Sequence, residues 1–281
     1  MDTKWRLERV FDSEQGTIAW DVLGSGPPVV LVHGTPFSSY VWREVAQALA
    51  QRFTVYCWDL AGYGQSAQYH GQDVSLAAQG RVLARLIEHW ELADPAVVGH
   101  DFGAAVTLRA HLLEGVAVSR LVLADAVALA PWGTGFFQLA SRHADVLEQL
   151  PDAVHEGLVR GYVTWPMRRR PCAQVAARLA DPWLGEVGKA ALYRQIVAND
   201  QRLTDEFEGL LGDVAVPTLV LWGEHDQWLP VEQGRQLAER IPAARLRVIA
   251  DADHLIMHDA PAVVAVEVAA FLAGDEGPRS S

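Results

Sequence analysis

Aspartate at position 101 lies in a short motif that could carry covalent chemistry. The motif, Gly99-His100-Asp101-Phe102-Gly103, follows the apolar run 96–98 and precedes an alanine-rich helical pattern. Glycines two positions before and after a central residue are typical of a nucleophile elbow, a strained strand-to-helix turn that exposes the central side chain. Asp101 could also act as the N-cap of the following helix. No Gly-x-Ser-x-Gly occurs in the sequence, so any elbow here carries an aspartate.

Two further motifs supply the partners that a buried nucleophile needs. Asp226 follows the apolar run 218–222 in a Gly-x-x-Asp turn, and His254 ends Asp251-Ala252-Asp253-His254 after the run 246–249. The order nucleophile, acid, histidine is that of a triad built on an elbow. Asp125 also follows a predicted strand and is a rival for the acid position. The turn chemistry around Asp226 favours Asp226.

The segment His33-Gly34-Thr35-Pro36 follows the first buried run. A backbone amide from this loop and the amide after the nucleophile can form an oxyanion hole, which assigns the N–H groups of Thr35 and Phe102. The same segment is also typical of a tight turn with a cis proline. We predict no metal site, because the two cysteines lie far apart and no acidic partner helix supports a His254/His258 pair. We predict no cofactor.

Short apolar runs alternate with longer helical patterns along most of the chain. The predicted strands are 29–32, 53–58, 96–98, 121–123, 218–222 and 246–249, and the predicted helices are 40–51, 75–90, 104–113, 231–240 and 261–272. Continuous apolar runs bounded by turn residues indicate strands buried on both faces, as in a parallel sheet. The fold class is therefore α/β, a mostly parallel sheet flanked by helices.

One long segment, residues 127–212, interrupts this alternation. It is helical in character, is divided by prolines and contains no convincing strand. We interpret it as an inserted helical cap over the end of the sheet, so that residues 1–126 and 213–281 form the core. The alternative is a helical layer that only packs against the sheet.

These motifs together resemble the α/β-hydrolase fold superfamily, in the branch with an aspartate nucleophile. That branch contains epoxide hydrolases and haloalkane or haloacetate dehalogenases. The resemblance covers nearly the whole chain and includes Asp59-Leu60-Ala61-Gly62-Tyr63-Gly64-Gln65-Ser66 besides the motifs above. It implies an alkyl ester on Asp101, formed by attack on saturated carbon and hydrolysed by water that His254 activates, with Asp226 orienting His254.

Stabilisation of the leaving group separates the two activities. Epoxide opening needs a proton donor, and the segment Ala191-Leu192-Tyr193-Arg194 resembles the one that carries a cap tyrosine in epoxide hydrolases, with Tyr162 as the second candidate. Both branches usually carry tryptophan after the nucleophile, or arginine in the haloacetate enzymes, where this chain has Phe102. We favour epoxide hydrolysis over carbon–halogen hydrolysis. A non-hydrolytic lyase, cyclase or ligand-binding protein is the remaining alternative.

Further residues are expected to line an apolar substrate pocket, although a tryptophan is more often a plain core or interface residue. They are His33, Pro36, Trp132, Trp165 and Trp228. The substrate is then a small apolar or weakly polar organic molecule.

The composition limits the partners. The 281-residue chain is 50% hydrophobic with a net charge of -12, and an acidic surface repels nucleic acid and anionic lipid. The charged N-terminus lacks a signal-peptide pattern, and no apolar run has the roughly 18 residues of a membrane span. We expect a cytoplasmic monomer or homodimer that binds neither nucleic acid nor membrane.

Overall fold

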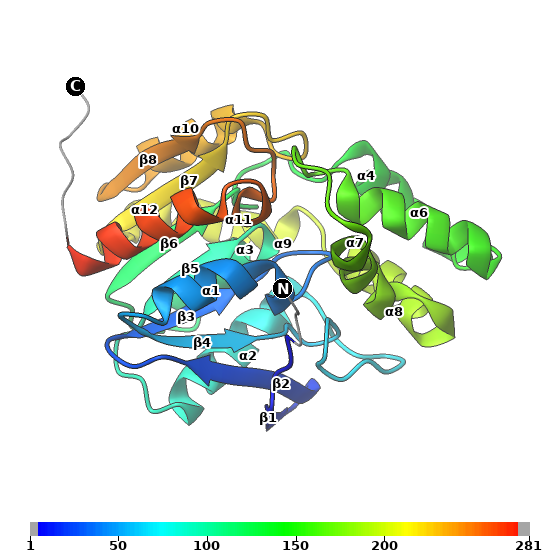
Figure 1. Cartoon of the computed structure of the whole chain (residues 1–281), viewed down its shortest axis with the longest axis horizontal. Coiled ribbons are helices and arrows are strands. Elements are labelled where there is room, and N and C mark those ends of the chain that lie inside the picture. The colour runs from blue at the N-terminus through cyan, green and yellow to red at the C-terminus, as the bar shows by residue number, and fades with distance from the viewer. Residues whose placement is uncertain (1–4, 275–281) are drawn as a thin grey trace.

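The computed structural model describes residues 5–274, which fold around one eight-stranded sheet (Figure 1). Its strand order is β1-β2-β4-β3-β5-β6-β7-β8. Strands β3 to β8 are parallel, whereas β1 and β2 are antiparallel to each other and β2 is antiparallel to β4. The strands are β1 (Arg9–Ser13), β2 (Gly16–Leu23), β3 (Pro28–Val32), β4 (Thr54–Trp58), β5 (Ala96–His100), β6 (Arg120–Ala124), β7 (Thr218–Gly223) and β8 (Ala244–Ile249).

The parallel strands are those that the apolar runs predicted. Every residue of β5 and of β7 is buried, which is why these runs are continuous rather than alternating. The mostly parallel α/β fold is thereby confirmed.

The antiparallel hairpin β1–β2 was not anticipated. β1 lies at the edge of the sheet and is largely exposed, so its sequence Arg-Val-Phe-Asp-Ser carries no continuous apolar signal. The turn ends at Gly16, whose φ of 86° is readily adopted by glycine.

Helices cover both faces of the sheet. The pair α1 and α12 packs together on one face, and α2 packs against α3 on the other (Figure 1). The core helices are α1 (Arg43–Leu49), α2 (Leu76–His89), α3 (Phe102–Leu112), α10 (Val231–Arg240), α11 (Ile256–Asp259) and α12 (Pro261–Ala273), with the 3-10 turn η1 (Ser39–Trp42) before α1. No helix in the described part of the chain is long and apolar enough to cross a membrane.

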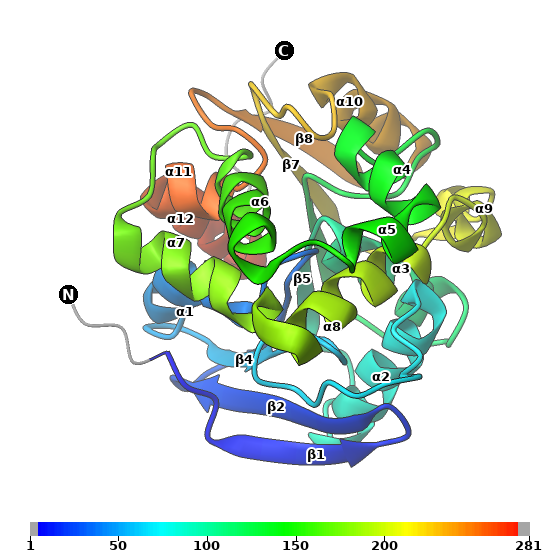
Figure 2. The same cartoon turned by 90° about the vertical axis from the view of Figure 1, so that its right-hand side faces the viewer.

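Between β6 and β7 the chain forms a helical insertion. Its elements are α4 (Gly135–Arg142), α5 (Ala144–Leu147), α6 (Asp152–Thr164), α7 (Ala173–Ala180), η2 (Asp181–Trp183), α8 (Gly185–Val197), α9 (Arg202–Glu208) and η3 (Leu211–Asp213). Figure 2 shows α6, α7 and α8 in front of one end of the sheet. This is the carboxyl end of the parallel strands, because the Trp183 indole N–H donates to the Pro36 carbonyl (2.6 Å), just after β3.

Candidate active site

The predicted nucleophile elbow is the turn between β5 and α3. Asp101 has φ 54° and ψ -120°, a strained conformation in which its 3% exposed side chain sits at the carboxyl end of the sheet. Glycine is required at both flanks of the turn. A Cβ at Gly103 would lie 2.3 Å from the Val32 carbonyl oxygen, and one at Gly99 would lie 2.5 Å from the Gly103 carbonyl oxygen.

The three predicted triad residues meet at one buried point. His254 Nδ1 lies 2.9 Å from Asp226 Oδ2, and His254 Nε2 lies 3.4 Å from Asp101 Oδ2. The side chains of His254 and Asp226 are fully buried. An Asp226 carboxylate that accepts from Nδ1 fixes the proton there, so Nε2 faces the nucleophile.

The Asp226 carboxylate is fixed by its own loop. Oδ1 accepts the backbone N–H groups of Trp228 and Leu229, each at 2.8 Å. These bonds leave Oδ2 to His254, so the Gly-x-x-Asp turn orients the acid.

Electrostatics favour the imidazolium form of His254. Burial lowers the pKa of His254, but the negative charges of Asp226 and Asp101 outweigh it and raise that pKa well above the ordinary value. A protonated His254 therefore faces both acidic side chains before any reaction.

The loop after β3 holds the other oxygen of the nucleophile. The Thr35 amide donates to Asp101 Oδ1 at 2.8 Å, and a Cβ at Gly34 would lie 2.4 Å from the Asp101 Cβ. Phe102 begins α3, and the first N–H groups of a helix have no partner within it. Both predicted oxyanion-hole amides thus belong to segments that adjoin the Asp101 carboxylate.

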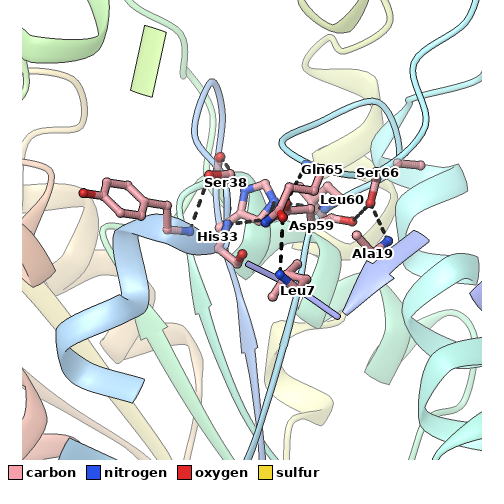
Figure 3. Close-up of polar contacts among 12 residues, drawn as sticks. Leu7, Ala19, His33, Ser38, Asp59, Leu60, Gln65 and Ser66 are labelled. Carbon is pink, nitrogen blue, oxygen red and sulfur yellow. Dashed lines mark hydrogen bonds and ion pairs between the residues drawn. The ribbon is translucent and has the colours of Figure 1, made fainter. Parts of the chain in front are cut away.

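His33 lies beneath this loop rather than against the substrate space. Its Nε2 accepts the Leu60 amide (2.9 Å), and its Nδ1 lies 2.9 Å from the Gly34 carbonyl oxygen (Figure 3). Asp59 accepts the amides of Ser39 and Gln65, both at 2.7 Å. The expectation that His33 lines the pocket needs correction, because both of its ring nitrogens contact backbone groups. The His33 ring instead holds the loop after β3 against the segment 59–66.

A small cavity adjoins the nucleophile. It is lined by Thr35, Asp101, Phe102, Val127, Trp132, Gly133, Thr134, Phe137, Tyr162, Trp228 and Leu229. The free space is about 20 Å³, enough for about one water molecule. The predicted pocket residues Trp132 and Trp228 therefore lie on its wall, as does the predicted donor Tyr162.

Three predicted residues lie elsewhere. Tyr193 places its hydroxyl 3.2 Å from His155 Nδ1 within the helical insertion and does not line this cavity, because α8 turns it into the packing of the insertion. Trp165 is 43% exposed, with its N–H directed at Gln227. Pro36 contacts Trp183 through its carbonyl and is likewise absent from the cavity wall. These placements correct the expectations for Tyr193, Trp165 and Pro36.

Gln195 is a buried residue of the site that sequence reasoning missed. Its Oε1 accepts the hydroxyls of Thr35 (2.7 Å) and Tyr63 (2.8 Å), which joins α8 to the oxyanion loop. Asn199, one turn later, accepts the Leu76 amide at 2.8 Å. Gln195 lies on the buried face of α8 three residues after Leu192, and Asn199 is buried just beyond the end of the helix, three residues after Ile196. That helical spacing could have identified both.

Three further side chains near His254 in space or in sequence are Asp125, His258 and His100. Among the described residues, Asp125, Asp226 and His254 are the one set of metal-ligating type that converges, with single atoms within 4.8 Å of one another. His258 is not part of this set, because its Nε2 lies 3.0 Å from the Arg169 carbonyl oxygen. His100 Nε2 lies 3.0 Å from the His254 carbonyl oxygen and supports the histidine loop.

Known proteins share this architecture. A family model described as the alpha/beta hydrolase fold matches residues 27–261. A solved alpha/beta hydrolase fold protein from Burkholderia ambifaria is 41% identical, with a TM-score of 0.90 over 93% of this chain and 97% of that chain.

Characterised relatives differ in their chemistry. Haloalkane dehalogenase 2 of Mycobacterium tuberculosis is 29% identical over 272 residues, 92% of this chain and 93% of that protein. The pimeloyl-acyl-carrier-protein methyl ester esterase of Vibrio atlanticus is also 29% identical, over 85% of this chain and 91% of that protein. Equal identity to a dehalogenase and an esterase leaves the reaction to be argued from the site.

Proposed function

We propose that this chain, which belongs to the alpha/beta hydrolase fold family, hydrolyses small organic molecules at saturated carbon through an alkyl ester on Asp101. One observation carries the proposal: the elbow presents a carboxylate with one oxygen on a backbone amide and the other facing His254. An aspartate is already ionised near neutral pH, so its first attack needs no base.

The first step uses the Asp101 oxygen that faces His254. Oδ2 attacks the carbon of the substrate and a new C–O bond forms as the bond to the leaving atom breaks, the leaving atom taking the electron pair. Oδ1, held by the Thr35 amide, becomes the carbonyl oxygen of the ester.

The second step follows because the first removes a charge. The negative charge of Asp101 helps to raise the pKa of His254, so esterification lowers that pKa and the imidazolium gives up its proton to the leaving atom or to solvent. The neutral His254 can then take a proton from water while the water oxygen attacks the ester carbonyl carbon. The amides of Thr35 and Phe102 stabilise the oxyanion, and its collapse expels the alcohol product, which receives the proton from His254. The carboxylic acid left on Asp101 then passes its proton to His254, which restores the starting state.

Tyr162 favours an epoxide as substrate. It lines the cavity together with Asp101, and burial followed by the charge of Asp101 raises its pKa. The phenol therefore stays protonated and can donate to the oxygen released from an opened ring. This single donor supports epoxide hydrolysis, with the helical insertion as the cap that supplies it.

Carbon–halogen hydrolysis is the second candidate. Trp228 lines the same cavity, and its buried indole N–H has no hydrogen-bond partner among the described residues. An N–H donor of this kind suits a departing halide, and the similarity to haloalkane dehalogenase 2 of M. tuberculosis points the same way. The narrow cavity favours a small apolar or weakly polar substrate in either case.

Trapping the ester tests the proposal. In His254→Gln the ester should form but not hydrolyse, because the base is lost while the carboxylate remains. Intact-protein mass spectrometry after incubation with styrene oxide and 1,2-epoxybutane, and separately with 1-bromobutane and bromoacetate, should show a stable adduct. The mass of the adduct identifies the substrate class.

The matched control is the double variant Asp101→Asn/His254→Gln. It keeps the shape of the site and should gain no mass, which locates the adduct on Asp101. A folded His254→Gln protein that gains no mass with any of the four compounds contradicts the alkyl-ester route and favours the non-hydrolytic alternative.

A further inference from the structure

Asp125 is a buried carboxyl group that the mechanism above does not use. It follows β6 with φ 40°, in the left-handed region that aspartate and asparagine tolerate better than most residues. Its side chain is fully buried, and Oδ1 accepts the Gly223 amide at 2.7 Å. The other carboxyl oxygen, Oδ2, still needs a hydrogen-bond partner.

Oδ2 of Asp125 belongs to a carboxyl group that adjoins the Asp226 carboxyl. It is buried without a hydrogen-bond partner among residues 5–274, yet its neighbours include Asp226 and His254, whose ligand-type atoms lie within 4.8 Å. His254 Nδ1 is already bound to Asp226 Oδ2. Two carboxylate oxygens can share a hydrogen bond only when one of them carries a proton.

We propose that Asp125 is protonated on Oδ2 and donates a hydrogen bond to the Asp226 carboxylate. It is thus a positioning residue that holds the triad acid on His254. The inference rests on the proposed role of Asp226 as the triad acid, but not on the identity of the substrate.

The charges around Asp125 support the neutral form. Burial raises the pKa of Asp125, and the negative charge of Asp226 raises it further, while His254 and the Gly223 amide oppose the shift less strongly. The Asp226 carboxyl accepts two backbone amides and lies against the imidazole Nδ1, whereas the Asp125 carboxyl accepts one backbone amide. One proton on Asp125 gives its Oδ2 a hydrogen-bond partner, the Asp226 carboxylate.

Infrared spectroscopy of the wild-type protein tests the protonation directly. With aspartate labelled by 13C at the side-chain carboxyl, a band of a neutral carboxylic acid should persist at pH 7, where other aspartates are ionised. The band should be absent in Asp125→Asn. A wild-type spectrum with only carboxylate bands at pH 7 overturns the proposal.

Asparagine is also the matched variant for the geometry. Its amide oxygen can accept the Gly223 N–H, its NH2 can donate to Asp226, and it tolerates the backbone conformation of Asp125. We therefore expect the pKa of His254, followed by NMR, to change by less than about half a unit in Asp125→Asn. If Asp125 were ionised, losing its charge would lower the pKa of His254 by a unit or more.

These measurements need no substrate, so they can fail independently of the adduct experiment. Elemental analysis of the purified protein tests the remaining possibility, that a metal ion lies between the two carboxyl groups. A stoichiometric divalent metal bound by the wild type and lost in Asp125→Asn would overturn the protonated form, because a cation would then occupy the space between the carboxylates.

Discussion

At the scale of single residues, the site depends on which polar groups share one buried space. The His254 ring lies against the carboxyls of both Asp101 and Asp226, and Tyr162 lines the same cavity as Asp101. Tyr193 was predicted for that role from its sequence context, but its hydroxyl is engaged by His155. Substitution of the two tyrosines should therefore affect the rate of epoxide opening differently.

Tyr162→Phe should slow epoxide opening by about a hundredfold, because a positioned general acid contributes on the order of 10²–10⁴ in rate. Tyr193→Phe is the control and should change that rate by less than about threefold. Single-turnover adduct formation in the His254→Gln background measures the step itself. An equal effect of both substitutions would contradict the assignment of Tyr162.

At the scale of elements, α8 connects the helical insertion to the oxyanion loop. Gln195 is buried and accepts the hydroxyls of Thr35 and Tyr63. These bonds fix the carboxyl half of α8 against the loop whose Thr35 amide donates to Asp101. The insertion therefore helps to hold the loop that carries Thr35, and its residues also line the cavity beside Asp101.

Gln195→Leu should lower the free energy of unfolding by about 2 kcal/mol, because the two hydroxyls lose their acceptor inside the protein. Val197, 52% exposed on the same helix, provides the control: Val197→Ala should change it by less than about 0.5 kcal/mol. Urea unfolding measures both. Equal stability of the two variants would show that the Gln195 contacts contribute nothing.

At the scale of the whole molecule, stability should pass through a maximum near pH 6.5. Burial lowers the pKa of His33, His100 and His155, so the unfolded chain takes up more protons below pH 6.5 and stability falls there. The pKa values of His254 and Asp125 are raised, so above pH 6.5 the folded protein holds more protons and stability falls as pH rises.

Each extra proton held by one state changes the free energy of unfolding by about 1.4 kcal/mol per pH unit. Urea unfolding from pH 5 to 9 should show the maximum. Asp101→Asn removes a charge that raises the pKa of His254, and it should flatten the alkaline decline. A stability that rises steadily to pH 9 would contradict the assignment of His254.

The sequence alone determined the parallel core, and it predicted the order of the proposed triad residues. Buried parallel strands leave continuous apolar runs, and the glycines around Asp101 are demanded locally by contacts of 2.3 and 2.5 Å that a Cβ would make. The edge hairpin β1–β2 left no such signal, because an exposed strand needs no apolar run.

Only the tertiary structure decided how the distant side chains are used. Tyr162 and Tyr193 both follow helical patterns, and nothing local distinguishes the helix face that meets the cavity from the face that meets His155. Asp125 and Asp226 both end strands, but the neighbouring positions of β6 and β7 bring the two carboxyls together. Hydrogen bonds between side chains that are 28 to 160 positions apart in the sequence depend on how the helices and strands pack. That packing is a property of the folded chain as a whole.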